Sequence, residues 1–112
     1  MRKDGKLDYL EMQAAGAIDS VKSFYSAAFG WTFTDYGPRY SAFSEGLDGG
    51  FDASAAQDAK PLPVLYSADL ERTLRLVEDA GATIKRPIFD FPGGRRFHFT
   101  DPAGNEVAVW AE

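Results

Sequence analysis

Residues 95–110 read RRFHFTDPAGNEVAVW, and this stretch decides the fold. At its centre, Asp101–Asn105 carries Asp, which bonds back to the backbone, Pro, which presets φ, and Gly, which accepts a positive φ. Polar and apolar residues alternate on both sides of this turn, as is typical of half-buried strands. The stretch therefore predicts a β-hairpin with a tight turn at Asp101–Asn105.

A tight turn also fixes which side chains of the hairpin share a face. The predicted cross-strand pairs are Thr100 with Glu106, His98 with Ala108, and Arg96 with Trp110. We call the face that these six residues share the mixed face. The other face carries Phe97, Phe99, Val107 and Val109, which we expect to lie under a helix.

Two helices are predicted from apolar stripes at helical spacing. The stripe of the first consists of Ile18, Val21, Phe24, Tyr25 and Ala28, and that of the second of Leu70, Leu74 and Val77. Asp19 is the predicted N-cap of the first helix and Gly30 its end. Asp69 and Glu71 lie where the dipole of the second helix favours negative charge, and Gly81 ends it.

Strands are predicted around these helices from alternation of side chains. Their ranges are Leu7–Gln13, Trp31–Tyr36, Arg39–Ser44, Leu62–Ser67, Thr83–Pro87, Arg95–Thr100 and Glu106–Trp110, with a weak edge strand opened by Gly49-Gly50-Phe51. By parity, Leu10 and Met12 lie under the first helix, whereas Tyr9, Glu11 and Gln13 join the mixed face.

The order β-α-β-β-β occurs twice, which predicts an α+β fold of two modules with helices on the outer face of curved mixed sheets. Asp19 and Asp69 lie 50 residues apart, and Gly30 and Gly81 lie 51 apart, as an internal duplication would place them. The first module is residues 1–53, and the second is residues 62–112. The aperiodic, polar residues 54–61 are the predicted linker.

Composition excludes several classes of protein. The chain has 112 residues, of which 45% are hydrophobic, and no apolar run approaches the roughly 20 residues that a membrane span needs. It has no cysteine, and its start, MRKDGK, lacks the apolar segment of a signal peptide, so we expect a cytoplasmic protein. The net charge of −5 argues against nucleic-acid binding and leaves room for a small cationic ligand.

Four motifs together are similar to those of the vicinal oxygen chelate superfamily, which includes glyoxalase I, bleomycin-resistance proteins and ring-cleaving dioxygenases. They are FY…FGW at residues 24–31, VEDAGA at 77–82, FPGG at 91–94 and DPAGN at 101–105. They follow the family's order across nearly the whole chain. The resemblance implies two modules that form a ligand cup, usually completed in a homodimer.

The same resemblance also implies metal ligands that this chain lacks. Members that use a metal place His, Glu or Gln at positions that correspond here to Tyr9, with Leu10 one residue away, Leu62 and Ala108. The remaining position falls within Gly50–Asp52, where Asp52 is the sole donor. A divalent ion needs several converging N or O donors. We therefore expect no metal and no cofactor.

The candidate site residues have alternative interpretations. The predicted ligand-binding residues are Tyr9, Gln13, Tyr66, Arg96, His98 and Trp110. The catalytic candidates are Glu11, His98 and Glu106. His98 is either a general base or a structural histidine that forms a hydrogen bond across the sheet. Glu11 and Glu106 form a carboxylate pair, or one is solvated and the other is paired with Arg96. Arg95 either joins Arg96 in binding an anion or faces solvent.

Three functions remain open at this point. The first is metal-independent binding of an amphipathic or cationic small molecule in an aromatic-lined cup of a homodimer. The second is a glyoxalase-related lyase or isomerase that uses Glu11, His98 and Glu106, with or without a divalent metal. The third is a protein-interaction module in which the mixed face is a partner surface. Whether the protein is an enzyme is left undecided by the sequence.

Overall fold

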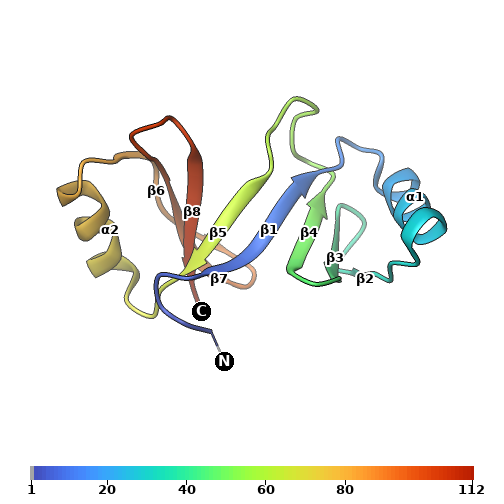
Figure 1. The fold of residues 1–112 in the computed structure, drawn as a ribbon, viewed down its shortest axis with the longest axis horizontal. Coiled ribbons are helices and arrows are strands. Elements are labelled where there is room, and N and C mark those ends of the chain that lie inside the picture. The colour runs from blue at the N-terminus through green and yellow to red at the C-terminus, as the bar shows by residue number, and fades with distance from the viewer. Residues whose placement is uncertain (1) are drawn as a thin grey trace. The chain divides into compact units, whose positions relative to one another are not determined.

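A computed structural model describes residues 2–112 and confirms the α+β fold, with two helices and eight strands in that part of the chain. The chain forms two compact units (Figure 1). The first unit is Tyr9–Pro61, and the second is Leu62–Glu112 together with the segment that ends at Asp8. Among residues 2–112, neither helix has the length and apolar content that crossing a bilayer demands.

The first unit contains α1, which spans Ile18–Phe29, and a sheet with the strand order β2-β3-β4-β1. The strands are β1 (Leu7–Gln13), β2 (Thr34–Asp35), β3 (Tyr40–Ser44) and β4 (Asp48–Asp52). The β1–β4 pair is parallel, and the other pairs are antiparallel, so the sheet is mixed. Its core is aromatic: Phe43 and Phe51 are buried, and Tyr25, Trp31 and Phe33 pack against them.

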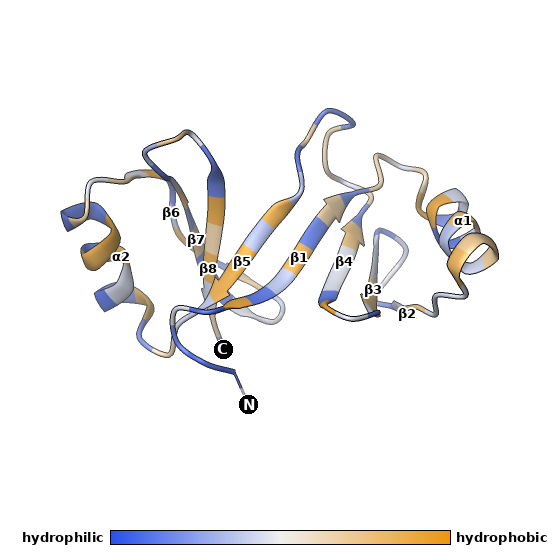
Figure 2. Cartoon of the chain, viewed as in Figure 1, coloured by the Kyte–Doolittle hydropathy of each residue, from blue (hydrophilic) through white to orange (hydrophobic). Residues whose placement is uncertain are grey.

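The second unit contains α2, which spans Leu70–Asp79, and a mixed sheet with the strand order β5-β8-β7-β6. The strands are β5 (Leu62–Tyr66), β6 (Thr83–Phe91), β7 (Gly94–Thr100) and β8 (Glu106–Ala111). Hydrophobic and hydrophilic residues alternate along α2 (Figure 2). Its apolar side packs on the sheet, where Leu70, Phe97 and Val109 are buried together.

The hairpin at the end of the chain has the predicted register. Thr100 pairs with Glu106, and His98 pairs with Ala108. The carboxylate of Asp101 accepts hydrogen bonds from the backbone N–H groups of Ala103 and Asn105, both at 2.9 Å. Local turn chemistry thus fixes which side chains reach the mixed face of β7 and β8.

Two predictions about local structure are wrong. Asp19 is not the N-cap of α1, because the helix begins one residue earlier and Ala17 caps it without a side-chain hydrogen bond. The strand at Gly49–Phe51 is not an edge strand. It is β4, which lies between β3 and β1, and its glycines allow Phe43 and the β1 backbone to approach closely.

Two predicted strands also change length. The strand predicted at Trp31–Tyr36 shortens to Thr34–Asp35, and Trp31 and Phe33, which precede it, pack into the aromatic core. The strand predicted to end at Pro87 continues to Phe91. Register shifts on either side of Arg86 leave Pro87 outside the regular hydrogen-bond ladder with β7, so its missing N–H is tolerated.

Candidate functional site

Two rows of side chains cross the mixed face of the second unit, and strand register defines both. The first row runs from β6 through β7 and β8 to β5 and consists of Arg86, His98, Ala108 and Val64. The second row lies beside it and consists of Phe89, Arg96, Trp110 and Tyr66. Directly paired residues share a face of a sheet, so these eight residues lie on one face, which we call the two-row surface, although Val64, Ala108 and His98 are buried on it.

The second row is aromatic and cationic. The rings of Tyr66 and Trp110 meet edge to face with centroids 5.5 Å apart, and the ring of Phe91 lies 6.3 Å from that of Trp110. The guanidinium of Arg96 lies 5.5 Å from the centroid of Phe89 and 5.6 Å from that of Phe91. Rings of this kind offer apolar area and π faces to a flat ligand.

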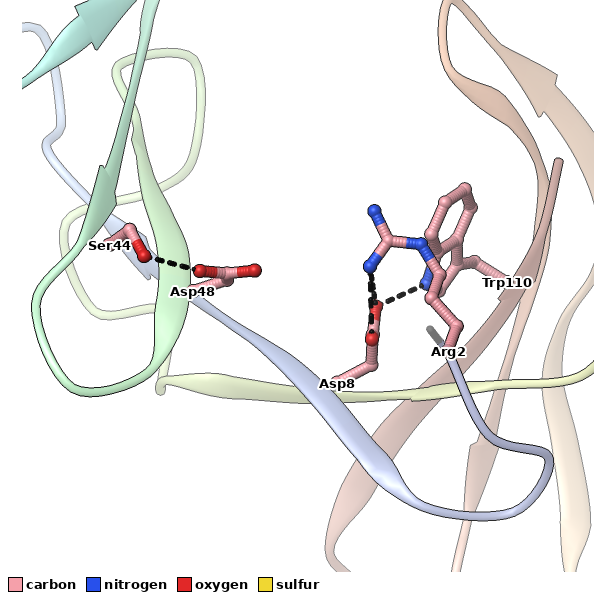
Figure 3. Close-up of polar contacts among 5 residues, drawn as sticks. All are labelled: Arg2, Asp8, Ser44, Asp48 and Trp110. Atoms are coloured by element: carbon pink, nitrogen blue, oxygen red, sulfur yellow. Dashed lines mark hydrogen bonds and ion pairs between the residues drawn. The ribbon is translucent and has the colours of Figure 1, made fainter.

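The N-terminal segment holds Trp110 in place. The indole Nε1 donates to Asp8 Oδ2 at 2.9 Å, and Arg2 Nη1 donates to the same carboxylate at 3.1 Å (Figure 3). The guanidinium of Arg2 also lies over the indole ring, 4.8 Å from its centroid. The backbone of Gly5 donates to the Tyr66 carbonyl at 2.8 Å, which ties this segment to β5.

His98 is buried, and only 6% of its surface is exposed. Its Nδ1 lies 2.7 Å from Glu106 Oε2, so the histidine bonds across the sheet, as its structural interpretation predicts. Burial lowers the pKa of His98 below its ordinary value of 6.5. The hydrogen bond from Lys85 and then that from His98 lower the pKa of Glu106, so the carboxylate is ionised and accepts from both.

The other ring nitrogen of His98 has no such partner. Nε2 is buried and makes no hydrogen bond with any residue in the range 2–112. Because Nδ1 donates its hydrogen to Glu106, Nε2 of the neutral ring carries a lone pair. Arg86 is the cross-strand neighbour of His98 on β6, and the ring of Phe89 lies 5.7 Å from the imidazole.

The first unit has a polar cluster of its own. Its central residue, Tyr40, was not predicted from the sequence. The hydroxyls of Tyr9 and Tyr40 lie 2.6 Å apart, and Tyr40 donates to Glu11 Oε1 at 3.2 Å. Burial raises the pKa of both tyrosines, so both remain protonated phenols. The Tyr40 ring lies directly over Gly50, where a Cβ would collide with it. Side-chain alternation along β3, together with Gly50, could have indicated the position of Tyr40.

The structure thus places the predicted site residues in two groups. Tyr66, Arg96, His98, Glu106 and Trp110 lie in the second unit. Tyr9, Glu11 and Gln13 belong to β1 in the first unit, where Gln13 is in register with Asp52. In the first group, Tyr66, Arg96, His98 and Trp110 belong to the two-row surface, and Glu106 contacts it through His98.

Arg95 does not belong to either group. It forms an ion pair with Glu71 of α2 at 2.6 Å, which lowers the pKa of Glu71 to about 2. The Arg95 side chain is 39% exposed, which agrees with the solvent-facing alternative, and it pairs with the helix rather than joining Arg96. Glu106 pairs with Lys85 at 2.8 Å.

Comparison with known proteins identifies the family. The model of the glyoxalase/bleomycin resistance protein/dioxygenase superfamily matches residues 6–109. The chain belongs to this superfamily. No curated protein sequence matches the chain significantly.

Solved structures agree with this fold. A superfamily member from Vibrio splendidus has a TM-score of 0.71 at 13% identity, with 96% of this chain and 100% of that chain covered. A structure described as an NAD-dependent benzaldehyde dehydrogenase from Legionella pneumophila has a TM-score of 0.74 at 15% identity, with 92% and 96% covered. The Mn(II)-bound glyoxalase from Novosphingobium aromaticivorans has a TM-score of 0.68 at 18% identity, with 99% of this chain but 40% of that chain covered. At these identities the likeness shows the fold alone.

Superfamily members that bind a metal raise the question of whether this chain has the donors for one. At the position of Ala108 the side chain is apolar, and its partner in register on β5 is Val64, which is apolar too. Leu62 at the start of β5 is also apolar. In the second unit, therefore, neither of the expected positions supplies a metal ligand.

The expected positions in the first unit do not supply metal ligands either. Burial keeps Tyr9 a neutral phenol. Asp52 Oδ1 accepts hydrogen bonds from the N–H and the hydroxyl of Ser54 at 2.9 and 2.6 Å. In residues 2–112, no three His, Asp or Glu side chains gather as a metal ion would require. The donor set of the described residues does not fit a divalent metal.

Proposed function

We propose that this protein binds a small amphipathic molecule without a metal, on the two-row surface of its second unit. The observation that carries the proposal is the adjacency of an aromatic row, from Phe89 to Tyr66, and a buried imidazole nitrogen that lacks a hydrogen-bond partner. The rings supply apolar contact, and the imidazole supplies a directional polar contact. Binding sites for small molecules combine these two features.

Charge refines the class of ligand. Arg2 lies over Trp110, and Arg86 lies over Phe89 at 3.6 Å, so guanidinium groups already occupy the π faces that would attract a cation. Arg2 is paired with Asp8, but Arg86 forms no ion pair within residues 2–112 and so adds positive charge to this face, although the whole chain has a net charge of −5. The positive charge on this surface therefore favours an amphipathic ligand without positive charge over a cationic one.

Binding of the fluorescent probe anilinonaphthalene sulfonate (ANS), an aromatic anion, tests this proposal. We expect saturable binding to the folded protein, weakened about 10-fold by Trp110→Ala because a stacking surface is lost. Trp110→Phe keeps a ring and should weaken binding less. Tyr36→Ala removes an aromatic side chain that is 66% exposed in the first unit and serves as the matched control.

Two results would contradict the proposal. One is an ANS affinity that Trp110→Ala and Tyr36→Ala change equally. The other is native mass spectrometry that finds a stoichiometric transition metal bound by the purified chain, because the proposed site holds none.

The His98–Glu106 pair favours one alternative function, metal-free proton transfer as in an isomerase. A carboxylate on Nδ1 orients the imidazole and leaves the Nε2 lone pair as a base. Such a catalyst would exchange a carbon-bound proton of its ligand with solvent. Incubation of a retained ligand in D₂O tests this: deuterium incorporation that His98→Gln abolishes supports catalysis, and no incorporation leaves binding alone.

We further propose a homodimer as the assembled form, since the resemblance described above implies one. The superfamily membership supports this proposal. Light scattering on the purified chain tests it, and a monomeric mass across a range of protein concentrations would contradict it.

A further inference from the structure

The unpaired Nε2 of His98 requires a hydrogen-bond donor. A buried polar atom without a partner destabilises the fold, so such atoms are rare in folded proteins. Glu106 fixes the tautomer, because an ionised carboxylate only accepts hydrogen bonds and Nδ1 therefore keeps the hydrogen. The group that satisfies Nε2 must donate a hydrogen, as a hydroxyl or an N–H does.

Arg86 offers hydrogen-bond donors, whereas Nε2 of His98 is an acceptor. It is the cross-strand neighbour of His98, and within residues 2–112 its guanidinium makes no hydrogen bond or ion pair. The guanidinium lies over the face of the Phe89 ring, 3.6 Å from the centroid. Stacking leaves the in-plane N–H groups of a guanidinium available, and these suit a carboxylate.

We infer that Arg86 and His98 together recognise a small 2-hydroxycarboxylate, with the carboxylate on Arg86 and the neighbouring hydroxyl donating to His98 Nε2. This inference rests on the proposed function and assigns the ligand's polar end. The apolar body of the ligand lies along the second row, beginning at Phe89, which is in register with Arg96.

The surrounding charges select a hydroxyl over an amine. An amino acid would bring its ammonium group close to Arg86, whose like charge repels it. A divalent cation at Nε2 would meet the same repulsion. A neutral hydroxyl donates to the imidazole at no electrostatic cost, so this corner of the two-row surface discriminates against both.

Imidazole ¹⁵N NMR with 3-phenyllactate as the probe tests the inference. This compound carries a ring, a carboxylate and an adjacent hydroxyl. Two analogues each lack one feature: 3-phenylpropionate has no hydroxyl, and 3-phenyllactamide has no charge. We expect 3-phenyllactate to shift the Nε2 resonance of His98 and to bind about 10-fold more tightly than either analogue.

Variants separate the two contacts. Arg86→Met keeps an apolar stem over Phe89 and should abolish the preference for 3-phenyllactate over its amide, with the preference over 3-phenylpropionate retained. His98→Phe should abolish the preference for 3-phenyllactate over 3-phenylpropionate and retain the preference over the amide. Arg75→Met removes the same charge from α2, which packs against the other face of the sheet, and should leave both preferences unchanged.

The outcomes distinguish this inference from the proposed function. Saturable ANS binding that depends on Trp110, combined with equal affinity for 3-phenyllactate and its two analogues, overturns the inference and leaves the proposed function standing. Absence of binding by ANS and by 3-phenyllactate alike overturns both. An Nε2 resonance that 3-phenyllactate does not move at saturation also overturns the inference.

Discussion

Glu106 holds the imidazole of His98 from the neighbouring strand, with 2.7 Å between Oε2 and Nδ1. The two residues lie diagonally on β8 and β7, because His98 is in register with Ala108 and Glu106 with Thr100. Lys85 on β6 donates to the other carboxylate oxygen at 2.8 Å. A buried neutral base, an ionised carboxylate and a surface ammonium thus span three strands.

This arrangement predicts how stability depends on pH. Burial lowers the pKa of His98 in the folded state below the ordinary value of 6.5, so the unfolded chain binds more protons between these two pKa values. The free energy of unfolding therefore falls as the pH drops through that window. Urea denaturation over a pH series should show this slope in the native protein and a flatter one in His98→Gln.

Glu106→Gln provides the matched control. The carboxylate opposes the effect of burial by stabilising the imidazolium, so its removal lowers the pKa of His98 further. The loss of stability should then extend to lower pH in Glu106→Gln than in the native protein. An identical slope in His98→Gln and the native protein would show that carboxylates alone account for it.

Tyr40 predicts a stability effect in the first unit. Tyr40→Phe removes the hydroxyl that joins Tyr9 to Glu11 and should lower the free energy of unfolding by about 1–2 kcal/mol. Tyr36→Phe makes the same change at an exposed side chain and should alter stability by less than about 0.5 kcal/mol. Chemical denaturation measures both. Equal effects would mean that the buried hydroxyl adds nothing.

The caps of the two helices offer a direct comparison between sequence and structure. Asp69 caps α2, and its carboxylate accepts from the N–H of Arg72 at 3.1 Å. Asp69→Ala should cost about 1 kcal/mol. Asp19 lies inside the first turn of α1, so Asp19→Ala should cost only a few tenths of a kcal/mol through the helix dipole. Thermal unfolding of both variants tests this difference, and a larger loss for Asp19→Ala would contradict it.

Both predicted helix starts carry an aspartate, yet only Asp69 forms a cap, and this difference marks the limit of local patterns. The turn at Asp101–Asn105 was predictable because its hydrogen bonds are internal to five residues. The register of β7 and β8, and with it the placement of His98 and Trp110 on one face, followed from that turn.

Contacts distant in sequence were not predictable in this way. The central position of β4 depends on parallel pairing with β1, and residues 14–47 lie between these two strands. The contact of Asp8 with Trp110 joins residues 102 positions apart. Alternation assigns each of these residues to a face, but it does not say which strands become neighbours, and the neighbours decide what a side chain touches.

The most direct test of the aromatic row is to remove the guanidinium group that lies over the Trp110 ring. Arg2 lies over Trp110 at 4.8 Å, so Arg2→Ala should free that face of the indole and tighten ANS binding about 3-fold, since a cation–π contact at an exposed site is worth about 0.5–1 kcal/mol. Lys3→Ala removes the same charge from the next residue and controls for the weaker attraction of the anionic probe. If the two variants change the ANS affinity alike, Arg2 acts only through its charge and the ring face it covers is not where the ligand stacks.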